Sequence, residues 1–234
     1  MTSFVGNEAI DDGGAIYASE SSIFVETGTL FMSNVASTGS GGGVYASISV
    51  ITLTGAAFIK NIGAWGGGVA LFSSGFPNEN SDGILSLKSI VSSISDEETG
   101  NSGPSYITGC RFDGNAAKNG GAIYTTAGYD AVVNSSFTRN FAAVQGGALL
   151  HTGTLEALTK CNFESNMAGE DGLAVMSFGI INNITDLTFR NNSFFCASGK
   201  YGLEENSDDV EEFDTCRWDL VCSHCTDPQC DVPA

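Results

Sequence analysis

Apolar and polar positions along the chain follow a long period that begins with a phenylalanine. Each phenylalanine of this series is followed by an asparagine three residues later, and the Phe-x-x-Asn unit occurs seven times. The phenylalanines are Phe4, Phe31, Phe58, Phe112, Phe137, Phe163 and Phe189, and the asparagines are Asn7, Asn34, Asn61, Asn115, Asn140, Asn166 and Asn192. Successive phenylalanines are 27, 27, 54, 25, 26 and 26 residues apart, so the longest interval is expected to hold two periods. A repeat of this length is typical of one coil of a solenoid.

The residues before each phenylalanine alternate with a period of two. The position two before Phe is small or apolar, as in Ala56 and Cys110, whereas the position directly before Phe is mostly polar, as in Arg111 and Ser136. Five residues before Phe the chain is apolar again, with Glu26 as the exception. This alternation predicts short strands with Phe facing inward. We therefore predict an all-β fold, a right-handed single-stranded parallel β-helix (solenoid) of about seven or eight coils with roughly three strands in each coil.

A second motif, a glycine pair followed by apolar residues, comes a few residues after most of the asparagines. The sequence reads GGAIY from Gly13 and again from Gly120, GGGVY from Gly41 and GGALL from Gly146. Glycine permits backbone angles and close approaches that a Cβ atom would block. The asparagine column predicts a side-chain ladder at a turn, because each amide can donate to and accept from the next coil.

Repeated Phe-x-x-Asn and Gly-Gly-Ala-(Ile/Leu/Val) motifs, in phase over about residues 4–195, resemble the repeats of the chlamydial polymorphic membrane proteins. The resemblance implies a pectin-lyase-like right-handed β-helix similar to autotransporter passengers, which are extracellular and serve in adhesion. Such repeats are also similar to those of predicted surface proteins of algae and other protists. After the repeats this chain has a Cys-rich tail where the bacterial pattern has an outer-membrane β-barrel, which favours a fragment or a eukaryote-like extracellular protein.

The end of the repeats predicts a domain boundary near residue 199. Residues 1–199 are expected to form the β-helix, and residues 200–234 an acidic, Cys-rich cap or the start of a further module. Within the helix, the stretch 71–105 is predicted to be either one degenerate coil or a loop that projects from one face, where loops often carry recognition. A first coil that begins at Phe4 would expose unpaired strand edges. We therefore expect further sequence before Met1, or a partner stacked on this end.

The composition is strongly acidic, with 9 Lys and Arg against 27 Asp and Glu and a formal net charge of −18. Nucleic-acid and anionic-membrane surfaces need basic patches, whereas Lys and Arg are scattered along this sequence. No apolar stretch is long enough to cross a bilayer. The first ten residues lack the basic start and apolar core of a signal peptide. The sequence thus argues against a nucleic-acid partner and against a membrane span in this segment, and leaves calcium, cationic partners or plain solubility open as explanations of the acidic charge.

The seven cysteines are predicted to have two different environments. Cys110 and Cys161 share one inward column with Ser135 between them, so their Cα atoms would be ~9.6 Å apart. A disulfide needs roughly 4.4–6.8 Å, so both are expected to be buried free thiols. The disulfide candidates lie in the tail and are Cys196, Cys216, Cys222, Cys225 and Cys230. Zinc binding by the CSHC motif is the alternative for this set, and an extracellular scaffold favours disulfides.

No catalytic constellation is evident in the sequence. The positions before the glycine pairs include Asp12 and Asp171 at opposite ends of the stack, so no carboxylate pair is placed for general acid and base catalysis. His151 shares its column with Ala18 and Ser177 and has no orienting acid there, so a catalytic triad is unsupported. We assign no catalytic residue, no metal ligand and no cofactor.

Two further patterns are weaker. Threonines recur four residues before Phe, which raises ice binding as a hypothesis, but the array is one residue wide and a Thr ladder favoured by β-propensity explains it. N-glycosylation sequons lie at Asn134, Asn183 and Asn191, about the number that composition produces by chance. The sequence predicts an extracellular or cell-surface β-helix with a structural or adhesive role, whose partners are other protein chains, surface components or glycans. The alternative is a carbohydrate-active β-helix, either a polysaccharide lyase or hydrolase or a glycan-binding module.

Overall fold

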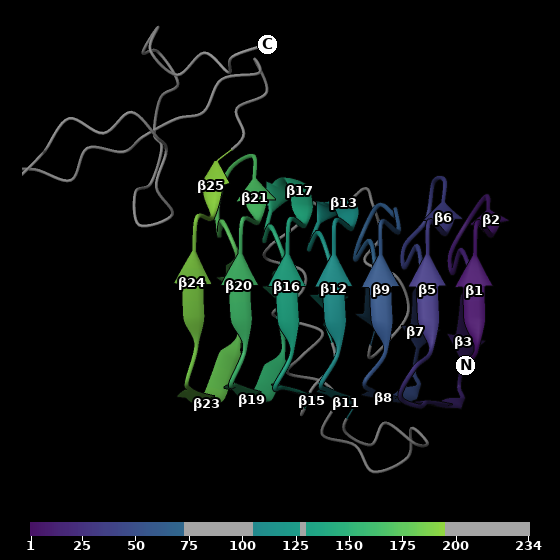
Figure 1. Cartoon of the computed structure of the whole chain (residues 1–234), viewed down its shortest axis with the longest axis horizontal. Coiled ribbons are helices and arrows are strands. Elements are labelled where there is room, and N and C mark those ends of the chain that lie inside the picture. Colours follow the sequence, from purple (N-terminus) through teal and green to yellow (C-terminus); the bar gives the residue numbers. More distant parts are fainter. Residues whose placement is uncertain (73–104, 127–129, 195–234) are drawn as a thin grey trace, which may run out of the picture.

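The computed structural model describes residues 1–72, 105–126 and 130–194, which form 25 β-strands and no helix. All strand pairs are parallel and join equivalent positions of successive coils, so the chain is a parallel β-helix. In Figure 1 the chain rises along the front sheet, returns along the back and advances leftward with each coil, which makes the helix right-handed. The predicted fold class is confirmed.

The phenylalanine of each repeat lies at the centre of a strand in one long sheet, which we call the Phe sheet. Its order is β1–β5–β9–β12–β16–β20–β24, with every Phe paired to the Phe of the next coil. The strands are β1 (Ser3–Val5), β5 (Leu30–Met32), β9 (Ala57–Ile59), β12 (Arg111–Asp113), β16 (Ser136–Thr138), β20 (Asn162–Glu164) and β24 (Thr188–Arg190).

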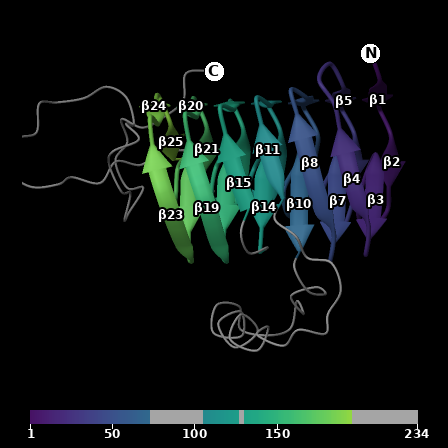
Figure 2. The same ribbon diagram turned by 90° about the horizontal axis from the view of Figure 1, so that it is seen from below.

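Two further six-stranded sheets complete the wall of the helix, and Figure 2 shows them from below. The sheet that follows the glycine pairs, here the glycine sheet, contains β3 (Ile16–Ser19), β7 (Val44–Ser47), β10 (Val69–Phe72), β14 (Ile123–Thr125), β18 (Leu149–His151) and β22 (Val175–Ser177). The sheet that carries the threonine column, here the Thr sheet, contains β4 (Ser22–Val25), β8 (Val50–Thr54), β11 (Tyr106–Thr108), β15 (Asp130–Val133), β19 (Thr154–Thr159) and β23 (Ile180–Thr185).

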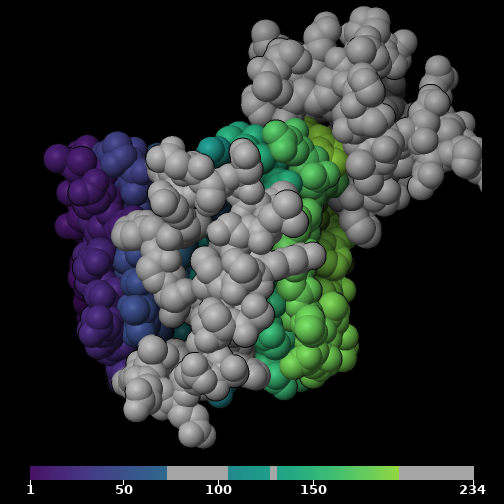
Figure 3. Space-filling model, turned by 180° about the vertical axis from the view of Figure 1, so that it is seen from behind, coloured from purple at the N-terminus to yellow at the C-terminus, as the bar shows by residue number. Residues whose placement is uncertain are grey.

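Short strands link the Phe sheet to the glycine pairs. They are β2 (Glu8–Ala9), β6 (Val35–Ala36), β13 (Ala116–Asn119), β17 (Phe141–Gln145), β21 (Met167–Ala168) and β25 (Ser193–Phe194). Isolated bridges from Val35 to Ile62 and from Ile62 to Ala116 join β6 to β13 across the coil between them. Figure 3 shows the face behind the Phe sheet, where the coils follow one another in sequence order.

The 54-residue interval between Phe58 and Phe112 is a single step of the stack. Strand β9 pairs directly with β12, and the two phenyl rings have centroids 5.0 Å apart. Leu53 of β8 likewise pairs with Ile107 of β11. Our expectation of two periods in this interval was wrong, because it assumed that every residue between two phenylalanines winds around the axis. The predicted coil or loop at 71–105 falls largely on residues 73–104, outside the described residues.

The main core is the interior of the helix, where the period-two alternation places the inward side chains. Phe31, Phe58, Phe112, Phe137 and Phe163 are fully buried, whereas their outward neighbours are partly or fully exposed in most coils. A second buried cluster lies on the outward face of the glycine sheet and contains Tyr45, Ala70, Phe72, Tyr124 and Leu150. Burial of the inward column removes apolar surface from water along the whole rod, which is the dominant stabilising term.

The first coil presents an open edge. None of the described strands pairs with β1, β2, β3 or β4 on their far side. Large apolar side chains there are 50–76% exposed, namely Val5, Ile10, Tyr17 and Phe24. An additional coil or a partner stacked on this end remains a prediction.

Candidate functional site

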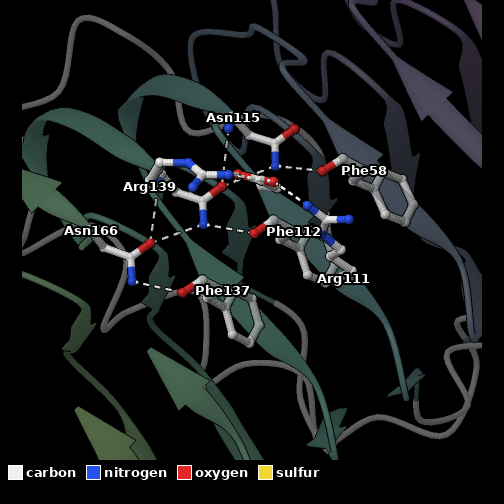
Figure 4. A network of polar contacts seen from close by, with 9 residues as sticks. Phe58, Arg111, Phe112, Asn115, Phe137, Arg139 and Asn166 are labelled. Carbon is white, nitrogen blue, oxygen red and sulfur yellow. Dashed lines mark hydrogen bonds and ion pairs between the residues drawn. The ribbon is translucent and has the colours of Figure 1, made fainter. Parts of the chain in front are cut away.

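The asparagines of the repeat form one continuous ladder between the Phe sheet and the short strands. The Nδ2 atom of Asn140 donates to Oδ1 of Asn166 at 2.9 Å and to the carbonyl oxygen of Phe112 at 3.1 Å. Its Oδ1 accepts from both the backbone N and the Nδ2 of Asn115, each at 3.0 Å. The same bonds link Asn7 through to Asn192, and Figure 4 shows the central part. The ladder therefore satisfies buried backbone groups in every coil.

The turn before each ladder asparagine has a fixed backbone conformation. The residue two after Phe has a positive φ of 51–65° in all seven coils, and we call this position the Asn corner. Its occupants are Gly6, Ser33, Lys60, Gly114, Arg139, Ser165 and Asn191. Side chains other than Gly and Asn are strained at such angles. Lys60 and Arg139 occupy two of these corners, both with φ 54°. The sequence alone did not show that these two positions have a left-handed backbone.

A charged network lies on the outward face of the Phe sheet beside the ladder. The Asp113 carboxylate accepts from Nη2 of Arg111 at 2.5 Å and from Nη2 of Arg139 at 2.6 and 2.8 Å. The side chain of Asp113 is 9% exposed, whereas those of Arg111 and Arg139 are 58% and 64% exposed. Figure 4 shows the two guanidinium groups close together above the stack of phenylalanines. One nearly buried carboxylate thus holds two exposed cations in place.

The structure gathers the basic residues that are scattered along the sequence. The described residues contain six Lys and Arg, namely Lys60, Arg111, Lys118, Arg139, Lys160 and Arg190. All except Lys118 lie on the Phe sheet or at the turns along its two edges, and the described strands of the glycine and Thr sheets carry none. The sequence signal that could have located them is their position relative to Phe in each repeat.

Two segments of the repeat that builds this ladder match a known family. Residues 2–19 and 109–126 match the Chlamydia polymorphic membrane protein (Chlamydia_PMP) repeat. Together these two segments make up 36 of the 234 residues, so the chain is similar to this repeat over part of its length. Each matched segment runs from the Phe sheet through the ladder asparagine and the glycine pair into the glycine sheet. No match is found among curated proteins or among solved structures.

The phenylalanines of the repeat form one continuous aromatic stack. From Phe4 to Phe189, consecutive rings have centroid separations of 4.6–5.1 Å and interplanar angles of 1–10°. Stacked aromatic pairs at this spacing stabilise a fold by more than the burial of their apolar area alone. The aromatic stack and the asparagine ladder run side by side. Two separate columns of contacts therefore fix the register between neighbouring coils.

The inward cysteines are free thiols, as predicted. Cys110 and Cys161 are both buried, and Ser135 lies on the coil between them. The Sγ of Cys110 contacts the carbonyl oxygen of Leu53 at 3.5 Å, and that of Cys161 contacts the carbonyl oxygen of Thr159 at 3.3 Å. Burial raises the pKa of both thiols, so they remain protonated and inert. The disulfide candidates Cys196 to Cys230 lie outside the described residues.

The carboxylates before the glycine pairs are too far apart to act together. Asp12 belongs to the first coil and Asp171 to the sixth, which places them ~24 Å apart along the axis at the rung spacing of a sheet. Glycosidase carboxylates work at about 5–9.5 Å. Desolvation raises the pKa of Asp12, and its Oδ1 accepts from the backbone N of Ser40 at 2.7 Å. Within the described residues, no group of three or more His, Cys, Asp and Glu is placed to hold a metal ion.

The sequon asparagines lie on the surface. Asn134 and Asn191 occupy exposed turns with φ of 50° and 51°, and Asn183 is exposed on β23. Glycosylation at these sites stays a prediction. The described part of the chain contains no helix of the length and hydropathy needed to span a bilayer.

His151 is fully buried in the inward column of the glycine sheet, between Thr125 and Ser177 of the neighbouring coils. Its Nδ1 lies 3.3 Å from Oγ of Ser177, and its Nε2 has no hydrogen-bond partner among the described residues. Burial lowers the pKa of His151 from 6.5 to about 4. It is therefore a neutral core residue at physiological pH, with no catalytic arrangement around it.

Acidification is expected to destabilise the protein through His151. Because the pKa is depressed in the folded state, the stabilising contribution is present above pH 6.5 and is lost as pH falls through about 4. The loss should reach up to about 3 kcal/mol, since one pKa unit corresponds to about 1.4 kcal/mol. Urea unfolding of the wild type and of His151→Leu between pH 7 and pH 4 measures it. If both proteins lose the same stability over this range, His151 does not control the acid response.

Proposed function

We propose that this chain is part of an extracellular or cell-surface β-helix that acts as an adhesive or structural scaffold. The observation that carries the proposal is the phased repeat similar to that of the polymorphic membrane proteins, whose Phe and Asn columns are constant while its outward positions differ from coil to coil. A rigid rod with variable outward positions offers a long binding surface, as other solenoids do. Its partners are other protein chains, surface components or glycans.

Catalysis is not part of this proposal. The carboxylates before the glycine pairs are separated by several coils, and His151 is buried without an acidic partner. A polysaccharide lyase or hydrolase needs acid, base or metal groups around one cleft. We therefore favour binding over turnover for this helix.

The test is localisation together with adhesion. Antibodies against the β-helix are applied to intact and to permeabilised cells of the source organism, and beads coated with purified chain are offered to the same cells. We expect labelling of intact cells and retention of coated beads above beads coated with an unrelated acidic protein. Labelling that requires permeabilisation, or equal retention of both kinds of bead, would refute the proposed function.

A further inference from the structure

We propose that Lys60, Arg111 and Arg139 form a binding site for the carboxylate or sulfate group of an acidic sugar. The site lies at the centre of the Phe sheet, on the consecutive coils of β9, β12 and β16. The inference rests on the proposed function, because it names the ligand class that a surface β-helix of this kind would bind.

Lys60 and Arg139 flank a position that has no side chain. Lys60, Gly114 and Arg139 occupy the Asn corner of three successive coils, so Lys60 and Arg139 originate ~9.6 Å apart along the axis. A Cβ atom built on Gly114 would meet only Cγ of Lys60, at 3.5 Å. The Gly114 position therefore carries no side chain of its own and is bordered by the aliphatic stem of Lys60, and Arg111 lies on the same coil as Gly114.

Asp113 positions the two arginines without using their full donor capacity. It accepts only from the Nη2 atoms of Arg111 and Arg139. Among residues 1–72, 105–126 and 130–194, no hydrogen bond is recorded for Nη1 or Nε of either arginine. Guanidinium N–H groups in this planar arrangement match the oxygens of carboxylate and sulfate. Two cations anchored by one carboxylate retain a net positive charge for an incoming anion.

The charge distribution favours a single acidic sugar over a polyanion. On the outward positions flanking Phe, the acidic side chains are Asp113 and Glu164, while Lys60, Arg111, Arg139 and Arg190 lie on these positions and the Asn corner. Charges farther away than about 8 Å are screened at physiological ionic strength. The local cations therefore decide the binding of one anionic group. A nucleic acid would instead extend over the acidic remainder of a chain with net charge −18.

The corner geometry supplies variants that remove charge without adding backbone strain. Asn tolerates positive φ, so Lys60→Asn and Arg139→Asn keep the turn at φ 54°. Lys160 is an exposed cation that also has φ 54°, at the other edge of the Phe sheet. The variant Lys118→Gln/Lys160→Asn therefore changes net charge by the same amount as Lys60→Asn/Arg139→Asn and serves as its matched control.

Binding of purified full-length chain is measured by isothermal titration with digalacturonate, a heparin disaccharide, neutral maltose and a single-stranded oligonucleotide. We expect binding of one or both acidic sugars, at least tenfold weaker in Lys60→Asn/Arg139→Asn and changed less than threefold in the control. The stronger of the two ligands identifies the anion as carboxylate or sulfate. If the double corner variant unfolds, Arg111→Gln tests the same site, because Arg111 lies on strand β12 and not at a corner.

Three results would overturn the site. They are no binding of either acidic sugar by the wild type, equal losses in the site variant and in the control, and tighter binding of the oligonucleotide. This outcome is independent of the proposed function, because it uses purified protein. If one of these three results is obtained while surface labelling and bead retention persist, the adhesive function stands and the site is removed.

Discussion

Replacement of Gly121 by alanine is expected to abolish stable folding, or to cost at least about 3 kcal/mol, because it drives a methyl group into the next coil. A Cβ atom on Gly121 would lie 2.1 Å from the carbonyl oxygen of Gly147 and 2.6 Å from that of Phe141. Neither backbone can retreat easily, since the N of Gly121 donates to Gly146 at 3.0 Å and the N of Ala122 donates to Ala148 at 2.9 Å. Soluble yield and chemical denaturation measure the effect.

Gly109→Asn is the matched control for this substitution. Gly109 has φ 65°, and the nearest atom to its Cβ position is 3.9 Å away. The next coil already carries Asn134 at the equivalent turn, with φ 50°. We expect a cost below about 1 kcal/mol, because Asn tolerates this conformation. If Gly121→Ala and Gly109→Asn are equally stable, close packing of backbone between coils does not explain the glycine pairs.

Asn140→Ala is expected to lower the free energy of unfolding by about 3–5 kcal/mol, since each buried polar group left without a partner costs about 1–3 kcal/mol. Asn140 is fully buried. Its removal takes the ladder partner from the backbone N of Asn115 and from the carbonyl oxygen of Phe112. Nδ2 of Asn115 keeps its bond to the carbonyl oxygen of Phe58, and Oδ1 of Asn166 keeps its bond from the backbone N of residue 140, but each loses one bond. Equilibrium urea unfolding gives the difference.

Asn162→Ala provides the comparison, because Asn162 lies at the partly exposed outward position before Phe163 on β20. We expect a change within about 0.5 kcal/mol, as for most surface substitutions. Asn140→Asp should destabilise the protein more than Asn162→Ala does. It keeps an acceptor for Asn115, but it loses both N–H donors of the amide and introduces a buried charge. A loss in Asn140→Ala no larger than in Asn162→Ala would show that the ladder does not stabilise the helix.

The two motifs of the repeat made the fold predictable, and the long interval shows the limit of such prediction. Phe and Asn keep a constant spacing of three residues and each occurs once in every coil. Equivalent strands therefore stack in parallel wherever the motifs recur. Distance along the chain between Phe58 and Phe112 does not determine how many coils it contains. Strand β9 pairs directly with β12, so the interval contains one step of the stack. The backbone groups of a strand form hydrogen bonds with whichever coil lies next to it in space, however many residues separate the two strands.

The charged network illustrates what a linear pattern conceals. Arg111 and Asp113 flank Phe112 and are predictable as outward neighbours on one strand. Arg139 is 26 residues away and reaches Asp113 only because the coils stack in register. Its corner has a positive φ that nothing in the residue type Arg indicates. The site therefore depends on the turn geometry of the whole column.

By itself, the sequence determined the parallel β-helix, the inward Phe column, the Asn ladder and the separation of Cys110 from Cys161, because each follows from a period matched to one coil. The tertiary structure alone decided three things: the single step from Phe58 to Phe112, the left-handed corners, and the gathering of Lys60, Arg111 and Arg139 on one face. The physical reason is that periodicity sets which side chains share a column. Pairing between coils and the twist of each turn set which columns meet.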